Sequence, residues 1–216
     1  MLKQAFKELI RKIRKGRSSY LFNVINLIAG FTTFILLSMV LNYELSYDRF
    51  NKNYSRIYRV QTLQEDSSPA NYCSFSPSAY RYHLLEELPE VESLTLVKEI
   101  NGQHFTLPDG KELYEKYGCW AENSLFSIFP VKMTEGSVTG SLTEPYTMIV
   151  SRKFASKIFP GGDATGKRII LDKKYPVTIT GVYEDIPENS ILRASFMLSL
   201  PTFEALKMRE NYRDSW

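Results

Sequence analysis

Histidine and cysteine are scarce in this sequence of 216 residues, which contains two of each. Two cysteines are too few for a disulfide-rich scaffold, and two histidines are too few for a metal cluster built from histidine. The mean hydropathy of −0.24 is too low for a protein with many membrane helices. Hydrophobic residues nevertheless make up 44% of the chain, which excludes an intrinsically disordered protein. We therefore expect one folded domain, with or without small additions.

Charged residues are absent from one long stretch near the N-terminus. No Asp, Glu, Lys or Arg occurs between Arg17 and Glu44, a run of 26 residues. About 20 apolar residues suffice for a helix that crosses the hydrocarbon core of a membrane, so the sequence predicts a transmembrane helix over residues 22–43. A cleaved signal peptide would have an apolar stretch of about 7–15 residues and then a small-residue cleavage site. Because neither feature is present, we favour a transmembrane helix over a signal peptide or a buried core helix.

The net charge of +3 is unevenly distributed. Residues 1–21 carry seven basic side chains and one acidic side chain, a net charge of +6, whereas the remainder of the chain carries −3. Basic residues that flank a transmembrane helix favour the cytoplasmic side. We therefore expect the N-terminus in the cytoplasm and residues 44–216 outside it. Those 173 residues are enough for a folded domain.

Residues 1–21 also show a helical repeat. Apolar side chains recur every three or four residues, and basic side chains occupy the other positions. The apolar positions are Leu2, Phe6, Leu9, Ile10 and Ile13. The pattern predicts a basic amphipathic helix that lies on the cytoplasmic surface of the membrane, with its cations near anionic membrane lipid. The alternative is a flank that only stops translocation.

One face of the predicted transmembrane helix is small or polar. At 100° per residue, Asn23, Asn26, Gly30 and Thr33 fall on the same side of the helix. Such residues pack and hydrogen-bond against other membrane helices. The chain has no second run of this length, so we expect partner helices from another molecule or from a further part of the polypeptide. Chance placement of tolerated polar residues is the alternative.

The segment 44–216 alternates between strand-like and helix-like patterns, so the fold class that we expect is α+β. A strong hairpin turn is expected at Asn101-Gly102, and Pro108-Asp109-Gly110 is expected to form the next turn. Strands are expected at residues 56–63, 91–100, 104–107, 169–171 and 177–183. Helices are expected at residues 76–88, 151–159 and 201–206, and a short helix or turn at residues 124–129.

The segment Gly161–Lys167 fits seven positions of the phosphate-binding loop, but the next residue is Arg168 where that loop needs Ser or Thr to reach Mg²⁺. A phosphate-binding loop also leaves a strand and opens a helix. Here the expected order is helix, loop, strand. We therefore expect a glycine-rich turn without nucleotide binding.

Other candidates for chemistry are weak. His83 and His104 have no acid or nucleophile at an informative spacing. Glu184, Asp185 and Glu188 form an acidic cluster that could hold a cation, although a solvated turn is the favoured interpretation because no ligand-rich loop surrounds them. Nothing indicates a hydrolase triad, a metal site, a cofactor or a nucleic-acid-binding face, so we expect no enzymatic activity from this chain.

Two cysteines, Cys73 and Cys119, both fall in the segment expected outside the cytoplasm. Disulfides form in such oxidising compartments. A disulfide between them is one interpretation, and two separately buried thiols are the other.

Several segments together resemble the MacB-like (FtsX-like) ABC transporter permeases of the Bacteroides-type branch. The basic amphipathic helix and the residues that follow it resemble the start of the family's sequences. The segments that carry this resemblance are 23–30, 43–50 and 56–60. The family's periplasmic core domain is resembled, in the same order, by residues 126–130, 142–145, 151–160, 166–167 and 177–190. The individual segments are short, but their joint order is specific and covers nearly the whole chain.

The resemblance implies a function in the cell envelope. Such permeases have four transmembrane helices per repeat unit and a periplasmic domain after the first helix, lie in the bacterial inner membrane, and act as dimers with an ABC ATPase subunit. In such permeases, ATP hydrolysis by the ATPase moves the periplasmic domain. This motion serves export through a periplasmic adaptor or outer-membrane conduit, the release of a lipoprotein, or the control of a cell-wall enzyme. This chain stops inside or near the end of that domain, so it resembles a truncated permease. The expected division is 1–21 (cytoplasmic helix), 22–43 (transmembrane helix) and 44–216 (periplasmic core domain).

The resemblance also gives the residues after the membrane helix a role. Tyr43, Tyr47, Phe50 and Tyr54 suit an interfacial belt that would anchor the junction between helix and domain. If this junction is stiff, helix and domain move together as a lever. The alternative function is a single-pass extracytoplasmic sensor or an anchored binding protein, which has the same outline; an extracytoplasmic enzyme is disfavoured because no catalytic constellation is visible.

Overall fold

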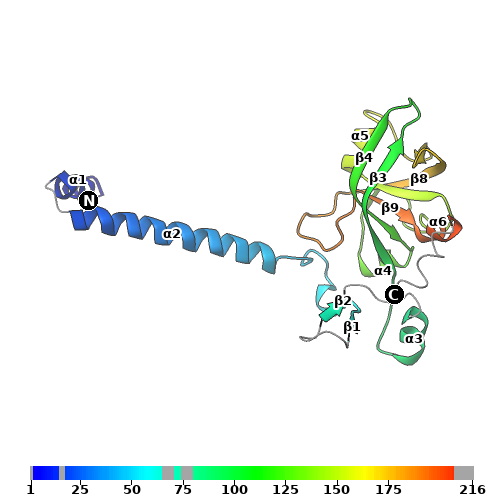
Figure 1. Cartoon of the computed structure of the whole chain (residues 1–216), viewed down its shortest axis with the longest axis horizontal. Coiled ribbons are helices and arrows are strands. Elements are labelled where there is room, and N and C mark those ends of the chain that lie inside the picture. Colours follow the sequence, from blue (N-terminus) through cyan, green and yellow to red (C-terminus); the bar gives the residue numbers. More distant parts are fainter. Residues whose placement is uncertain (1, 15–17, 65–70, 74–79, 207–216) are drawn as a thin grey trace. The chain divides into compact units, whose positions relative to one another are not determined.

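The computed structural model of the chain describes residues 2–14, 18–64, 71–73 and 80–206 (Figure 1). The chain divides into two compact units, and the division lies between Tyr47 and Asp48. Each unit is described by itself below.

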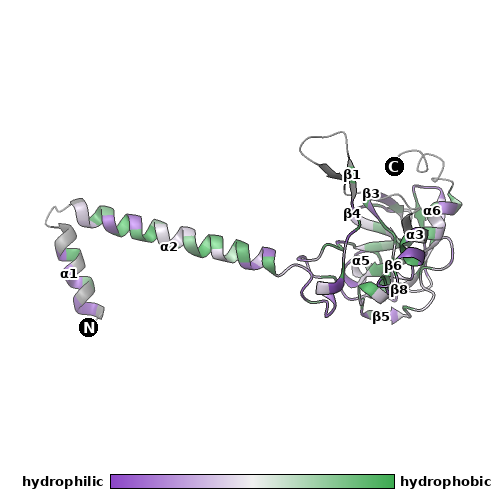
Figure 2. Cartoon of the chain, turned by 90° about the horizontal axis from the view of Figure 1, so that it is seen from below, coloured by the Kyte–Doolittle hydropathy of each residue, from purple (hydrophilic) through white to green (hydrophobic). Residues whose placement is uncertain are grey.

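The first unit consists of two helices, α1 (Leu2–Arg14) and α2 (Ser18–Leu45). Residues 19–45 of α2 form a helix that is long and apolar enough to cross a membrane. The large apolar side chains of α2 are exposed, for example Phe34 at 68% and Leu37 at 64%, and hydrophobic residues occur along its whole length (Figure 2). The helices that the sequence predicts in this region are therefore present, and α2 extends beyond residues 22–43 at both ends.

The second unit is built around a seven-stranded sheet. Its strands are β3 (Val97–Thr106), β4 (Glu112–Ala121), β5 (Met133–Gly136), β6 (Thr147–Ser151), β7 (Arg168–Leu171), β8 (Tyr175–Tyr183) and β9 (Phe196–Ser199). Their order is β5-β8-β6-β9-β4-β3-β7, and β7 pairs back to β8, so the sheet closes on itself. The β4–β9 and β6–β8 pairs are parallel, whereas the other pairs are antiparallel. With its helices, this mixed sheet makes the fold α+β, as the sequence predicts.

Short elements complete the second unit. They are η1 (Tyr54–Arg56), β1 (Thr62–Gln64), β2 (Asn71–Cys73), α3 (Tyr80–Glu87), α4 (Leu125–Ile128), α5 (Arg152–Ile158) and α6 (Leu200–Ala205). Strands β1 and β2 pair with each other in a separate antiparallel ribbon.

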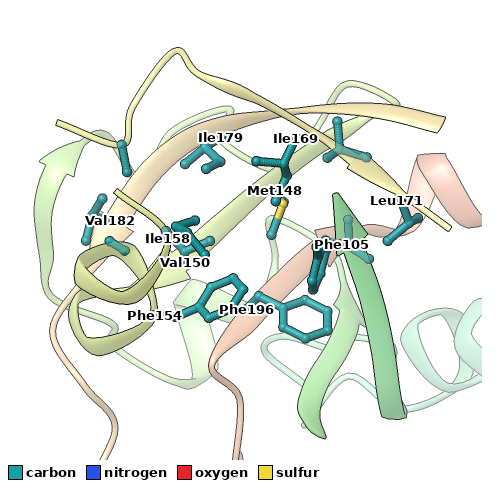
Figure 3. Packing of buried hydrophobic residues seen from close by; sticks show 14 of the residues in the cluster. Phe105, Met148, Val150, Phe154, Ile158, Ile169, Leu171, Ile179, Val182 and Phe196 are labelled. Atoms are coloured by element: carbon teal, nitrogen blue, oxygen red, sulfur yellow. The ribbon is translucent and has the colours of Figure 1, made fainter. Parts of the chain in front are cut away.

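The main core lies between the closed sheet and α5. At its centre three phenylalanines meet: the ring of Phe105 contacts the rings of Phe196 at 5.0 Å and Phe154 at 5.7 Å (Figure 3). Each of these side chains is at most 2% exposed, and burial of a phenylalanine stabilises a fold by about 1.5–3 kcal/mol. Among the side chains that the structure describes, no hydrophobic residue before Ile100 is buried. The described core is therefore built by residues from Ile100 onward.

Several predicted elements are confirmed. Helix α5 begins at the expected cap, where the Ser151 hydroxyl accepts a hydrogen bond from the Phe154 amide at 3.2 Å. Strands β7 and β8 form the expected antiparallel pair, and Pro201 lies in the first turn of α6. The glycine-rich segment connects α5 to β7, so it runs from a helix to a strand and lacks the geometry of a phosphate-binding loop.

The expected hairpin turn at Asn101-Gly102 is wrong. Strand β3 runs through both residues, and the chain reverses at Pro108-Asp109-Gly110, where the Leu107 amide donates to the Lys111 carbonyl. Gly102 keeps a positive φ of 107° inside the strand, which glycine tolerates. A Cβ at this position would lie 2.0 Å from the Tyr114 hydroxyl of β4, so the absent side chain makes room for that ring rather than for a turn.

The expected strand at residues 56–63 is also mostly wrong. Residues 57–61 belong to no strand, and only β1 at the end of this segment is paired. Tyr58 is 85% exposed and Val60 is 41% exposed. The alternating pattern therefore does not place this segment against the core of the second unit.

Strands β5, β6 and β9 were not predicted from the sequence.

A matched pair of serines tests the helix caps. Replacement Ser151→Ala should lower the free energy of unfolding by about 1 kcal/mol, because the Phe154 amide loses its hydrogen-bond acceptor. Ser124 also precedes a helix, but its side chain makes no cap hydrogen bond. Ser124→Ala should therefore change the free energy by less than about 0.5 kcal/mol. Chemical unfolding of both variants gives the comparison, and equal losses would contradict the assigned cap.

Candidate functional site

The chain enters the second unit at Asp48, which makes several hydrogen bonds to one distant loop. Its amide donates to the Asn189 carbonyl at 2.9 Å. Its carboxylate accepts from the Ser190 hydroxyl at 2.7 Å and from the Ile191 amide at 3.1 Å. Asp48 has a φ of 54°, the left-handed conformation that Asp adopts more readily than most residues. The loop thus holds both the backbone and the side chain of Asp48.

Asn51 forms a second attachment three residues later. It is 1% exposed, and its side-chain amide donates to the Ile128 carbonyl at the end of α4 at 2.8 Å. Its side-chain oxygen accepts from the Asn53 amide at 3.0 Å, and its own amide donates to the Asp48 carbonyl. Buried polar groups are costly unless they are paired, and here each of these groups has a partner. We refer to Asp48 and Asn51, with their partners Asn189–Ile191 and Ile128, as the junction clamp.

The aromatic residues predicted for the junction lie on both sides of the division between the units. In the first unit, the rings of Tyr43 and Tyr47 meet edge to face at 5.8 Å. In the second unit, Phe50 is 46% exposed and Tyr54 is 47% exposed at the start of η1. Their exposure is compatible with the predicted interfacial belt, whose role stays a prediction.

Phe50 lines a pocket of about 240 Å³ within the second unit. The other lining residues come from two segments. Residues 129–132 follow Ile128, and residues 184–192 include Asn189–Ile191, so both segments adjoin partners of the junction clamp. These lining residues are Phe129, Pro130, Val131, Lys132, Glu184, Asp185, Ile186, Pro187, Ser190 and Leu192. Phe50 therefore packs at a recess between two loops of the second unit.

The acidic cluster beside this pocket is occupied by protein partners. Glu184 pairs with Lys132 at 2.7 Å and with Arg152 at 3.6 Å, and the hydrogen bond from Lys132 is the main cause of its lowered pKa. Asp185 accepts a hydrogen bond from the Lys153 amide in the first turn of α5 at 3.0 Å. Within the described residues, no group of His, Cys, Asp and Glu side chains could hold a metal ion. These two carboxylates thus organise the start of α5.

The predicted packing face of the membrane helix lies on α2. Asn23, Asn26, Gly30 and Thr33 all belong to this helix, and the Thr33 hydroxyl donates to the Ala29 carbonyl at 2.9 Å. No atom lies within 4 Å of a Cβ placed on Gly30, so the surface is open to a neighbouring helix. Helix contacts at this face stay a prediction.

The two histidines lie in ordinary surroundings. His83 forms an exposed pair with Glu87 on α3 at 3.5 Å, and the ring of His104 lies 5.0 Å from that of Tyr114. Neither arrangement provides a nucleophile.

Cys119 is a buried free thiol on β4. Burial raises its pKa from 9.0 to about 12, and the nearby carboxylate of Glu99 adds to the rise. Cys73 lies in β2, but its side chain is outside the part that the structure describes. The disulfide between Cys73 and Cys119 therefore stays a prediction.

Sequence reasoning did not identify Asp48, Asn51 and Ser190 as site residues. A weak local signal exists, because Asp and Asn just after a helix often form turns through their side chains. The partners of these side chains lie up to 143 residues away, and no spacing rule predicts them.

The chain matches one protein family and several solved structures. Residues 20–215 match the family described as MacB-like periplasmic core domain. The chain is also similar to the solved structure of a domain of a protein described as a permease from Porphyromonas gingivalis, with 27% identity and a TM-score of 0.56. This similarity covers 72% of the chain and 64% of the Porphyromonas gingivalis domain, so the chain spans less than two thirds of that domain.

Two further solved structures are more distant. The periplasmic region of MacB from Actinobacillus actinomycetemcomitans has 12% identity and a TM-score of 0.43, over 59% of this chain and 57% of that one. The extracellular domain of the noncanonic ABC-type transporter YknZ from Gram-positive bacteria has 14% identity and a TM-score of 0.46, over 76% and 74%. No curated protein matches the chain significantly.

The buried thiol gives a direct chemical test. In a Cys73→Ser variant, Cys119 should react with iodoacetamide at pH 8 at least about a hundredfold more slowly in the folded than in the unfolded protein, because the thiolate is the reactive form. Because the folded protein favours the protonated thiol, the contribution of Cys119 to the free energy of unfolding should fall as the pH rises from 9.0 towards about 12. Mass spectrometry measures the labelling, and equal rates would contradict the buried thiol. In the wild-type chain, a non-reducing digest with a Cys73–Cys119 linked peptide would instead establish the disulfide.

Proposed function

Because the chain belongs to the family of MacB-like periplasmic core domains, we propose that it forms part of the membrane subunit of an ABC transporter permease. A partner ATPase in the cytoplasm would hydrolyse ATP, and this chain would carry the resulting motion to its periplasmic domain. The motion would serve export, lipoprotein release or another process of the cell envelope.

The observation that carries this proposal is the direct connection of a membrane-length helix to the family's domain. The family match begins at residue 20, inside α2, and continues through the closed sheet. Most of the helix and the domain therefore fall within one family match, which supports a common role for the two parts. An anchored sensor or binding protein would need only the domain and any apolar helix.

We further propose the topology that the charge distribution favours. Residues 1–21 would lie on the cytoplasmic side, residues 22–43 would cross the bacterial inner membrane, and residues 44–216 would be periplasmic. Helix α1 exposes Lys3, Lys7 and Arg11 together with Phe6, a combination that suits the interface of an anionic membrane.

The partners follow from the same proposal. Membrane lipid would surround most of α2, and other transmembrane helices of the permease would pack on the face that contains Asn23, Asn26, Gly30 and Thr33. An ABC ATPase subunit would bind on the cytoplasmic side. A permease dimer and a periplasmic adaptor or outer-membrane conduit are the remaining partners that this family membership suggests.

The aromatic junction can be tested in the full-length permease. We expect the double variant Tyr47→Ser, Phe50→Ser to lower the ATPase-coupled activity at least about fivefold, because coupling between distant sites is typically worth that much. Tyr58→Ser is a matched control, since this tyrosine is 85% exposed in a segment without regular structure. ATP hydrolysis and substrate movement are measured in proteoliposomes.

Unchanged activity in the double variant would contradict the role of the junction aromatics. The broader proposal has its own test: the full-length permease, purified in mild detergent from its native host, should carry an ABC ATPase with it. If no ATPase copurifies, the permease function is wrong and an anchored sensor or binding protein becomes the better interpretation.

A further inference from the structure

Two routes connect the membrane helix to the closed sheet, and they differ greatly in length. The covalent route is long: α2 ends at Leu45, whereas the first strand of the closed sheet, β3, begins at Val97. Between the junction clamp and β3, residues 52–96 contribute no buried hydrophobic side chain among those that the structure describes. The described part of this segment is thus attached to the domain without a fully buried apolar side chain.

The covalent route has a long contour. Forty-five residues could extend to roughly 150 Å if they were pulled straight. A helix movement that followed this route alone would have to pass through all of these residues before it reached the sheet. The covalent route is therefore the less direct of the two.

The second route is non-covalent and short. Asp48 lies three residues beyond the end of α2, and its partners Asn189–Ile191 belong to the loop between β8 and β9. Asn51 binds Ile128 at the end of α4, and α4 follows directly on β4. Through these two attachments the entry point of the chain is connected to three strands of the closed sheet, β4, β8 and β9.

One buried hydroxyl lies at the centre of this route. Ser190 is fully buried, and its hydroxyl both donates to Asp48 and accepts from the Leu192 amide at 3.2 Å. Hydrogen bonds to a carboxylate are shorter and stronger than neutral ones, and the loss of one partner leaves a buried polar group unpaired. The attachment therefore resists separation better than an exposed turn would.

We propose that the junction clamp is the element that couples the membrane helix to the periplasmic domain, with Asp48 and Asn51 as its positioning residues. The clamp bypasses residues 52–96 and delivers helix motion to the loop between β8 and β9 and to α4. The proposal rests on the proposed permease function, because only a protein that transmits motion needs such a bypass. A turn that merely ends α2 would not affect the stiffness between helix and domain.

Spin labels measure that stiffness directly in the 216-residue chain in lipid nanodiscs. Labels are placed at Leu41→Cys in α2 and Lys153→Cys in α5, in a background that carries Cys73→Ser and Cys119→Ala. We expect a narrow distribution of label distances in this background and a broad distribution after Asp48→Ala or Asn51→Ala. Asp109→Ala is the matched control, because Asp109 likewise accepts a hydrogen bond from a backbone amide, that of Lys111, but in the β3–β4 turn.

Hydrogen exchange checks the clamp at the atomic level. In Asp48→Ala, the Ile191 amide should exchange about tenfold faster or more, because it loses its charged acceptor. Amides in β8 and β9 should keep their protection, which shows that the sheet remains folded. If Asp48→Ala unfolds the domain, Ser190→Ala removes one hydrogen bond of the clamp with a smaller change and should broaden the distance distribution on its own.

A narrow distribution that persists in the double variant Asp48→Ala, Asn51→Ala would overturn the proposal, and so would a distribution that is already broad without them. These outcomes are separate from the permease function, since neither measurement needs an ATPase. A permease that copurifies with its ATPase but keeps its stiffness without the clamp would retain its function and transmit motion by another route.

Discussion

Strand β8 pairs with β6 along one edge and with both β7 and β5 along the other, and this double pairing closes the sheet. The closure gives Phe105, Phe154 and Phe196 a common interior. It also fixes the two ends of β8, from which the short turn to β7 (residues 172–174) and the loop to β9 extend. Every feature of the candidate site depends on this frame, because the loop that receives Asp48 begins where β8 ends.

The membrane imposes a different constraint on the first unit. Helix α2 satisfies its backbone internally and presents apolar side chains on all sides except the face that contains Asn23, Asn26, Gly30 and Thr33, which suits a lipid environment with a neighbouring helix. A soluble helix of the same length would bury one face against a core. The contrast explains why the two units are built so differently within one chain: the second unit obtains its stability from a buried core, whereas the first unit needs lipid or other helices.

Local signals in the sequence were sufficient for part of this structure. The cap of Ser151 and the apolar positions Phe154, Ala155 and Ile158 specify α5 without outside help, and the uncharged run specifies α2. Gly102 misled the prediction, because its freedom serves the Tyr114 ring rather than a turn. Strands β5, β6 and β9 are four or five residues long, and their partners are far away in sequence. The junction clamp was out of reach for the same reason, since its chemistry is ordinary and only the fold brings it together.

The wide sequence separation of the clamp has a consequence for synthesis. Asp48 and Ser190 are 142 residues apart, and a chain grows from its N-terminus at about 5–20 residues per second. The helix therefore leaves the ribosome well before the loop that will hold its outer end exists. For several seconds of each round of translation α2 is a helix with an unfinished domain, and its outer end gains its attachment only when nearly all of the domain has been made.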